Sequence, residues 1–444
     1  MAVRCVVVSV LGGVLMFDSC QSGGSPGGGL PYWHGLDGSR GRVRRLVILG
    51  TILLRRGVGA FVRGGRDAHM RRSTRREFLR SGANAALAFG ASQFMAGCRS
   101  YDTPFAPTGR RSRVAAIRGA NLYRMTREAL AAFGGAEALV RPGETVFIKP
   151  NFCTAGFLTV DGVATGSCTK PDIVIALAEE CLRVGAGKVI IGDGGQARHF
   201  SWKELRTLDG STNLSEESRR LNAAYPGRLQ LACLIGDSPA WDAVPSPFTD
   251  LGRIYVSSLV SRADKVISVP VLKTHMITQM TGSLKNLVGV TSTEDYGFGT
   301  PSRMTLHNAI GGIEQCLLDI CAAVRPDFAI IDGSICGEGN GPTIIPGVMG
   351  ATVDMRDRLG DWLLLASDDP AAADATAARV IGHDPDRVKH LRMAYDQGLG
   401  QTREDLIEIV GASLDELRVE WRSAVPMQFA SHVVMQGLGL ILDR

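Results

Sequence analysis

Residues 265–275 read Lys-Val-Ile-Ser-Val-Pro-Val-Leu-Lys-Thr-His, a run of apolar residues that ends in two basic side chains, Lys273 and His275. A short apolar run of this kind is typical of a buried strand, and it predicts a strand over residues 265–271. In an open α/β sheet, ligands bind beyond the carboxyl ends of the strands. The stretch therefore predicts a fold and also the place of a site in that fold.

The same pattern recurs along the chain from residue 114 onward. We expect strands over residues 114–117, 145–148, 188–192, 229–234, 253–257, 265–271, 328–331, 362–366 and 405–410. We expect helices over residues 124–133, 171–184, 305–323 and 370–381. This alternation predicts an α/β fold with a mostly parallel sheet that helices flank on both faces.

Charged and polar residues follow several of these strands. Because side chains alternate along an extended chain, Lys149, Asn151 and Cys153 should share one side, and Lys273 and His275 another. An ammonium beside an imidazole suits the binding of a carboxylate or phosphate and the transfer of a proton. The alternative is structural: Lys149 and Lys273 would only pair with acidic residues at the sheet edge.

Two further segments carry suitable groups. Residues 281–289, Thr-Gly-Ser-Leu-Lys-Asn-Leu-Val-Gly, offer amides and hydroxyls to an anion, with charge from Lys285 and a donor from Asn286. A plain turn that enters a helix explains this spacing equally well, and the spacing is not that of a Walker loop. Glu338, in the glycine-rich residues 337–342, has Asp332 nearby, and two carboxylates can hold a metal or act as acid and base.

These observations predict one site at the carboxyl ends of the strands. The residues expected to be catalytic are His275, Lys273, Asp332 and Glu338. The residues expected to bind the ligand or a cofactor are Lys149, Asn151, Asp193, Lys285 and Asn286.

The cysteines leave several possibilities open. No Cys-x-x-Cys pair occurs, so local spacing excludes a ferredoxin-type cluster or a zinc ribbon. Cys153, Cys168 and Cys336 fall in loops expected at the polar edge, where they could together hold a metal or an iron–sulfur cluster. We favour free thiols or a disulfide between Cys153 and Cys168 over a metal.

The first 98 residues differ in character from the rest. Residues 1–69 hold 15 of the 54 glycines and no Lys or Glu, and we expect an unstructured extension. Residues 70–98 have the layout of an export signal: a basic start, an apolar stretch, and small residues before Cys98. We expect a linker over residues 99–113 and a tail over residues 412–444.

Two motifs sharpen the export hypothesis. Arg75-Arg76-Glu77-Phe78-Leu79 resembles the twin-arginine motif, which implies export to the periplasm by the twin-arginine machinery. Met95-Ala96-Gly97-Cys98 resembles a lipoprotein cleavage box, so Cys98 would carry a lipid tether.

The net charge of +5 belongs to this leader. Residues 1–97 contain 14 Arg and 4 acidic residues, so the remaining 347 residues carry a net charge of −5. No basic stripe with interleaved aromatic residues occurs, and we therefore expect no nucleic-acid partner. A few lysines at the strand ends of an acidic body favour a small anionic ligand.

The chain resembles the family called domain of unknown function 362 over about residues 114–411. The segments that carry the resemblance are residues 148–151, 188–194, 269–275, 282–289, 331–333, 338–342, 367–374 and 398–400. The resemblance implies one globular domain with a common site. Some family members carry an appended ferredoxin-like domain with two iron–sulfur clusters, and this chain lacks the cysteines of that domain.

We therefore expect an exported enzyme whose anion-binding acid/base site, with or without a metal, acts on a small acidic substrate. An iron–sulfur or metal-dependent redox protein is the first alternative. A periplasmic binding protein for an acidic solute is the second.

Overall fold

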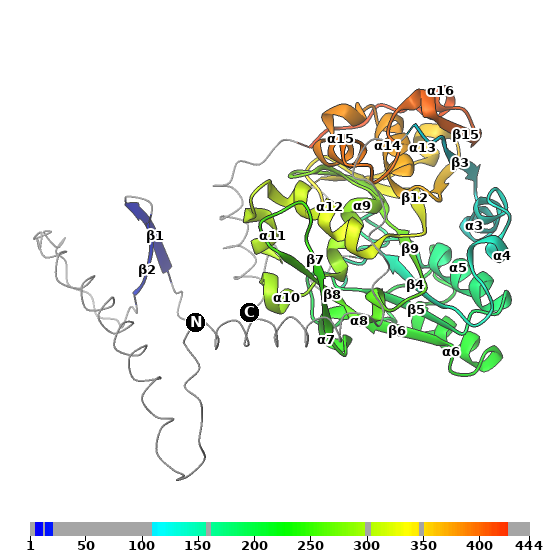
Figure 1. Ribbon diagram of the computed structural model, residues 1–444, viewed down its shortest axis with the longest axis horizontal. Coiled ribbons are helices and arrows are strands. Elements are labelled where there is room, and N and C mark those ends of the chain that lie inside the picture. Colours follow the sequence, from blue (N-terminus) through cyan, green and yellow to red (C-terminus); the bar gives the residue numbers. More distant parts are fainter. Residues whose placement is uncertain are drawn as a thin grey trace, which may run out of the picture. The chain divides into compact units, whose positions relative to one another are not determined.

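The computed structural model describes residues 5–11, 14–20, 109–156, 161–297, 303–345 and 350–424 (Figure 1). The proposed export signal and Cys98 lie outside the described residues, as do most of the linker and of the tail. In the N-terminal extension, strand β1 (Cys5–Leu11) pairs antiparallel with strand β2 (Val14–Cys20). A two-stranded hairpin is marginally stable at best on its own. That residues 1–69 form no folded unit stays a prediction.

One sheet organises the remainder of the chain. Its order is β15 (Ile407–Gly411), β3 (Ser112–Gly119), β14 (Trp362–Ser367), β12 (Phe328–Glu338), β9 (Lys265–Val269), β4 (Thr145–Pro150), β5 (Lys188–Asp193) and β6 (Leu229–Cys233). Along this order all neighbours pair parallel except β14, which runs antiparallel to both β3 and β12. The prediction of a mostly parallel sheet is confirmed.

Residues 265–275 form two strands where one was predicted. Strand β9 ends at Val269, and β10 (Val271–His275) follows after Pro270. Proline has no N–H to give to a ladder, so the pairing breaks there. Strand β10 then runs beside the outer half of β12, with Val271 opposite Asp332 and Lys273 opposite Gly337.

Shorter strands extend this outer part. Strand β11 (Gln279–Thr281) pairs antiparallel with β10, and β13 (Ala351–Asp354) pairs antiparallel with the end of β12. The predicted strand over residues 253–257 is β8 (Arg253–Ser257), but it forms a separate hairpin with β7 (Trp241–Pro245) and does not join the main sheet.

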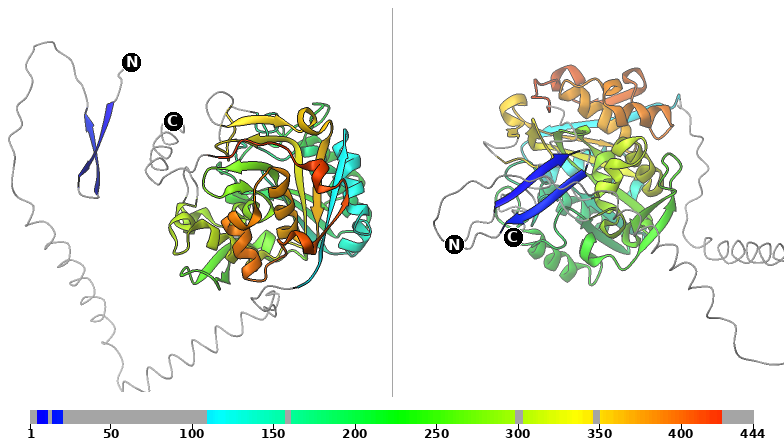
Figure 2. Two further views of the ribbon diagram at one scale, coloured as in Figure 1. Left: turned by 90° about the horizontal axis from the view of Figure 1, so that it is seen from above. Right: turned by 90° about the vertical axis from the view of Figure 1, so that its left-hand side faces the viewer.

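Helices cover both faces of the sheet. On one face lie α3 (Leu122–Ala131), α5 (Pro171–Arg183) and α6 (Leu214–Ala224); on the other lie α12 (Gly312–Val324), α14 (Pro370–Val380) and α15 (Lys389–Asp396). In the left view of Figure 2, α14 and α15 (orange) and α3 (cyan) lie on opposite sides of the strands. Among the described helices, none has both the length and the apolar character that a bilayer crossing requires.

The helix predicted over residues 305–323 is divided. Helix α11 (Met304–Asn308) ends before Gly311 and Gly312, whose φ angles of 89° and 76° lie in the left-handed region that glycine adopts at no steric cost. Helix α12 begins at Gly312 and carries the rest of the predicted span.

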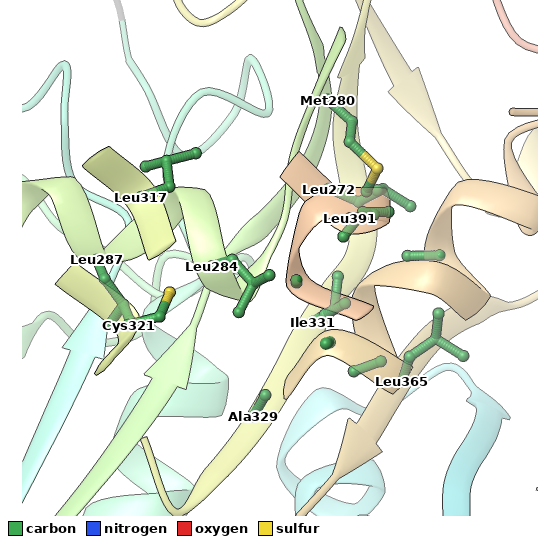
Figure 3. Close-up of a cluster of buried hydrophobic side chains, with 14 of the residues drawn as sticks. Leu272, Met280, Leu284, Leu287, Leu317, Cys321, Ala329, Ile331, Leu365 and Leu391 are labelled. Atoms are coloured by element: carbon green, nitrogen blue, oxygen red, sulfur yellow. The ribbon is translucent and has the colours of Figure 1, made fainter. Parts of the chain in front are cut away.

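Alternation along each strand builds two cores. Val146 and Ile148 of β4 pack under α3 and α5, whereas Phe147 faces the opposite core. In that opposite core, side chains from the sheet meet those of α12 and of α9 (Ser283–Asn286), such as Leu317 and Leu284 (Figure 3). Burial on both faces fixes the strand register, so the polar groups that follow the strands are held at one edge.

Candidate functional site

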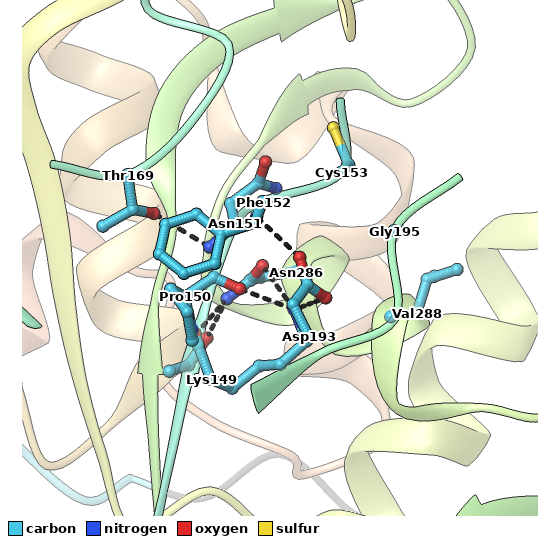
Figure 4. Close-up of polar contacts among 12 residues, drawn as sticks. Lys149, Pro150, Asn151, Phe152, Cys153, Thr169, Asp193, Gly195, Asn286 and Val288 are labelled. Atoms are coloured by element: carbon cyan, nitrogen blue, oxygen red, sulfur yellow. Dashed lines mark hydrogen bonds and ion pairs between the residues drawn. The ribbon is translucent and has the colours of Figure 1, made fainter. Parts of the chain in front are cut away.

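A buried network joins the ends of β4 and β5 to α9. Lys149 Nζ lies 2.6 Å from Asp193 Oδ1, and it donates to Asn286 Oδ1 at 3.1 Å and to the Pro150 carbonyl at 2.7 Å. Asn286 Nδ2 returns a hydrogen bond of 2.8 Å to the Lys149 carbonyl (Figure 4). Asp193 Oδ2 accepts from the Phe152 amide at 2.6 Å. Three of the predicted binding residues, Lys149, Asp193 and Asn286, thus meet, but they bind one another.

Lys149 and Asp193 carry opposite charges, so this network has no net charge. Burial lowers the pKa of Lys149, and the adjacent Asp193 carboxylate opposes that shift. Because the Asp193 carboxylate neutralises the ammonium and its other donors are engaged, we read Lys149 as a structural group that fixes the strand ends.

Lys273 is different because it is buried without a countercharge. Its side chain is fully inaccessible, and Nζ donates to the Ser167 carbonyl at 2.6 Å and to Asn151 Oδ1 at 3.2 Å. The Cys153 sulfur lies 3.9 Å from the same Nζ. Within the described residues no carboxylate pairs with Lys273. A desolvated ammonium with neutral partners is a site of unbalanced positive charge.

A second unbalanced ammonium belongs to Lys285 on α9. Its side chain is only partly exposed, and no described residue gives it a hydrogen bond or an ion pair. Burial lowers the pKa of Lys285 to about 8, and the positive charges of Lys273 and Arg303 contribute to that shift. Lys285 therefore titrates close to neutral pH, as a proton-transfer group must.

Helix α9 is held in place by a carboxylate from α14. Asp374 Oδ1 accepts from the Ser283 amide at 2.5 Å, and Oδ2 accepts from the Leu284 amide at 3.0 Å. Burial raises the pKa of Asp374 to about 7. A Cβ at Gly282 would lie 2.4 Å from Asp374 Oδ1, so only glycine permits this approach. Gly282 thus lets Asp374 hold α9, the helix that carries Lys285.

His275 is a neutral hydrogen-bond donor. Its Nδ1 accepts from the amides of Ile277 at 3.0 Å and Thr278 at 3.4 Å, so the proton of the neutral ring resides on Nε2. Burial, and then the charge of Lys285, hold the pKa of His275 well below its usual range. The ring can therefore donate from Nε2, but its second nitrogen is not available as a base.

The two predicted catalytic carboxylates are not brought to these lysines. Asp332 Oδ2 lies 3.3 Å from Lys170 Nζ and accepts from the Lys170 amide at 2.9 Å, while Oδ1 accepts from Ser334. Glu338 pairs with Arg358 at 3.0 Å and accepts from the Arg422 amide at 2.9 Å. Both carboxylates thus have partners that join the end of β12 to neighbouring segments.

The three thiols considered as metal ligands are all free. Cys168 bonds Thr154 Oγ1 at 3.3 Å, and burial raises the pKa of Cys168 to about 11. Cys336 is buried with its sulfur 3.7 Å from the Asp332 carbonyl, while Cys153 is partly exposed. In the described part of the chain, these sulfurs belong to no group of three metal-ligand atoms within 4.8 Å of one another.

Two residues at this edge were missed by sequence reasoning. Lys170 is one of only eight lysines in the chain, and this scarcity is the signal that could have found it. His390 on α15 is fully buried, with no hydrogen-bond partner for either ring nitrogen among the described residues. Nothing in the sequence around His390 distinguishes it from an ordinary helical residue.

The Lys170–Asp332 pair yields a first prediction. Replacing Asp332 with Ala leaves a buried ammonium without its carboxylate, which should lower the free energy of unfolding by about 3–5 kcal/mol. Urea denaturation measures this loss. The matched control is Asp361→Ala, which removes a carboxylate 43% exposed and paired with Arg118, and should cost less than about 1 kcal/mol. Equal, small losses in both variants would show that Asp332 is not structural.

His390 yields a second prediction. Burial lowers its pKa from 6.5 to about 3, so the unfolded chain takes up a proton between those pH values and the folded chain does not. Stability should fall as pH drops from 6.5, by about 1.4 kcal/mol per pH unit from this group at most. His390→Leu should make the acid loss shallower in denaturation curves taken from pH 7 to pH 4. A Met393→Ala control, which shortens a partly buried apolar side chain on the same helix, should lower stability at every pH but keep the wild-type slope; an unchanged slope in His390→Leu would contradict the assignment.

Comparison with known proteins gives the following similarities. The family described as domain of unknown function 362 matches residues 146–379. A thylakoid-associated protein from Synechocystis is 27% identical over 289 residues, which are 64% of this chain and 78% of that protein.

Two solved structures are also similar. A protein from Thermotoga maritima has a TM-score of 0.32 at 14% identity, over 57% of this chain and 58% of that one. The lactate racemase apoprotein from Thermoanaerobacterium thermosaccharolyticum has a TM-score of 0.29 at 12% identity, over 53% of each chain. This chain spans less than two thirds of the length of either structure. The family match covers more than half of the 444 residues, and the chain belongs to the family of domain of unknown function 362.

Proposed function

We propose that this protein is an enzyme that binds a small carboxylate- or phosphate-bearing substrate at Lys273 and Lys285. The observation that carries the proposal is the pair of ammonium groups held out of bulk water without a carboxylate partner among the described residues. Such an arrangement costs free energy in the empty protein, and an anion would offset that cost. Asn151 and the Ser167 carbonyl orient Lys273 toward this role.

The three basic side chains would have separate tasks. Lys273, fully buried, would anchor the anion. His275 would donate a hydrogen bond from Nε2 to an oxygen of the substrate, since its Nδ1 is occupied by backbone amides. Lys285, whose pKa of about 8 lies near neutral pH, would accept or donate the proton in the reaction.

The alternatives differ in the groups that they require. An iron–sulfur or metal-dependent redox protein built on Cys153, Cys168 and Cys336 requires their sulfurs to converge, and the proposal does not use them. A binding protein for an acidic solute requires the same lysines but no proton transfer. The pKa of about 8 at Lys285 suits the proton transfer that the enzyme requires, and turnover of the bound acid is what distinguishes the two functions.

Export is the second part of the proposal and is supported by the sequence alone. The twin-arginine motif at Arg75-Arg76 and the cleavage box at Cys98 favour a periplasmic protein with a lipid tether. Replacing both arginines with Lys should leave the full chain in the cytoplasm, because the receptor reads the guanidinium pair. Cell fractionation measures this, and periplasmic recovery of the double variant would contradict the twin-arginine route.

The anion site is tested with Lys285→Met in the full chain. Inorganic phosphate and succinate, as probes with two negative charges, should raise the melting temperature of the wild type, and the shift should shrink as pH rises above about 8, where Lys285 loses its charge. Lys285→Met should lose most of the shift. Its melting temperature without ligand should equal or exceed that of the wild type, because a desolvated charge has been removed.

The matched control is Lys203→Met, which removes an exposed lysine and should respond to both probes as the wild type does. A wild type that responds to neither probe, or a Lys285→Met variant that responds fully, would contradict the anion site. Incubation with mixed small organic and phosphorylated acids, followed by mass spectrometry, separates the two functions. Consumption of one acid supports an enzyme; retention of an acid without consumption supports the binding protein.

A further inference from the structure

A second group of functional side chains lies at the end of β6, and the anion site uses none of them. The imidazole of His199, the thiol of Cys233 and the carboxylate of Asp237 each place one ligand atom within 4.8 Å of the other two. Cys233 ends β6, Asp237 ends the short helix α7 (Leu234–Asp237), and His199 comes from the segment after β5. It is the one group of this kind among the described residues.

The backbone around these side chains favours their convergence. The amide of Cys233 donates to Asp237 Oδ2 at 2.7 Å, which orients that carboxylate and leaves Oδ1 directed to His199. Oδ1 lies 3.8 Å from His199 Nδ1, too far for a hydrogen bond. A Cβ at Gly236 would lie 2.0 Å from the His199 ring, so the ring rests in a space that only glycine leaves open.

The atom types match one class of ion, and a small inward movement of the side chains brings the ligand atoms to the spacing that it requires. One nitrogen, one sulfur and one oxygen are ligands that Zn²⁺ accepts together, at about 2.0–2.3 Å each, which places neighbouring ligand atoms of a tetrahedron roughly 3.3–3.8 Å apart. Ca²⁺ and Mg²⁺ require oxygen ligands and would not use the thiol.

We propose that His199, Cys233 and Asp237 bind one Zn²⁺ ion, with a fourth position left to water. The site is open to the ion because the His199 and Asp237 side chains are 62% and 41% exposed, while the Cys233 side chain is buried beneath them. On binding, the thiol of Cys233 releases its proton to solvent and becomes a ligand as the thiolate. Three protein ligands with an open fourth position are typical of zinc ions that bind a water or a substrate atom.

The test measures metal content and geometry in the full chain. Protein freed of metal by chelation and then dialysed against Zn²⁺ should retain one ion per chain. Co²⁺ in its place should give a sulfur-to-cobalt charge-transfer band and the intense visible bands of a tetrahedral site. His199→Ala and Asp237→Asn should each weaken Zn²⁺ binding by tenfold or more, and Cys233→Ser should abolish the charge-transfer band.

Two further variants make the result decisive. Gly236→Ala keeps all three ligands but displaces the His199 ring, and it should weaken Zn²⁺ binding as well. His383→Ala removes a histidine far along the chain, paired with Ser423, and should bind Zn²⁺ as the wild type does. No retained zinc in the wild type would overturn the proposal, as would binding that survives in His199→Ala and Asp237→Asn, whose exposed positions let both variants fold. None of these outcomes bears on the anion site, which has its own ligands and probes.

Discussion

The buried ion pair between Lys149 and Asp193 is the interaction on which the polar edge depends. Lys149 ends β4, Asp193 ends β5, and each also binds a further segment: Asn286 of α9 in one case and the Phe152 amide in the other. Two charges removed from water are tolerable only as a pair with their remaining donors and acceptors satisfied. Because the pair is satisfied in this way, it fixes the segment that carries Asn151 and Cys153 and the helix that carries Lys285.

Two other lysines, Lys273 and Lys285, lack such an ion pair among the described residues. Lys273 and Lys285 are shielded from water without an acid beside them in the described part of the chain, and their neutral partners compensate only part of the desolvation. Stability alone would favour an apolar side chain at Lys285. A charge that lowers stability and has no carboxylate beside it is expected at a functional site, where binding of an anion offsets its cost. The contrast between Lys149, which donates to Asn286, and Lys285, which precedes Asn286 on α9, separates the structural from the functional charge.

The two predicted catalytic carboxylates resemble Lys149 in having partners of opposite charge. Asp332 and Glu338 follow the predicted strand over residues 328–331, but the observed strand β12 runs on to Glu338 and includes both. Each has a basic partner that joins β12 to another segment. A catalytic carboxylate would also follow a predicted strand, so the sequence position does not distinguish the two roles. The side chain that lies next to each carboxylate in the fold does. Lys170, 162 residues away from Asp332, was the unseen partner. The group of His199, Cys233 and Asp237 was equally unseen, since its members come from two different strand ends and a turn of helix.

The sequence by itself determined the architecture. A sheet that is buried on both faces requires apolar runs of strand length separated by helices, and such runs can be recognised in the sequence. It also determined the edge at which charged residues gather, because the carboxyl ends of parallel strands point the same way. Pro270 showed why even this has limits: one residue without an N–H turned a predicted strand into two and placed Lys273 within β10. The tertiary structure alone decided which charged groups pair. The partners Lys149 and Asp193 lie 44 residues apart and Lys170 and Asp332 lie 162 apart, and the energy of each pair depends on burial, which no local sequence pattern records.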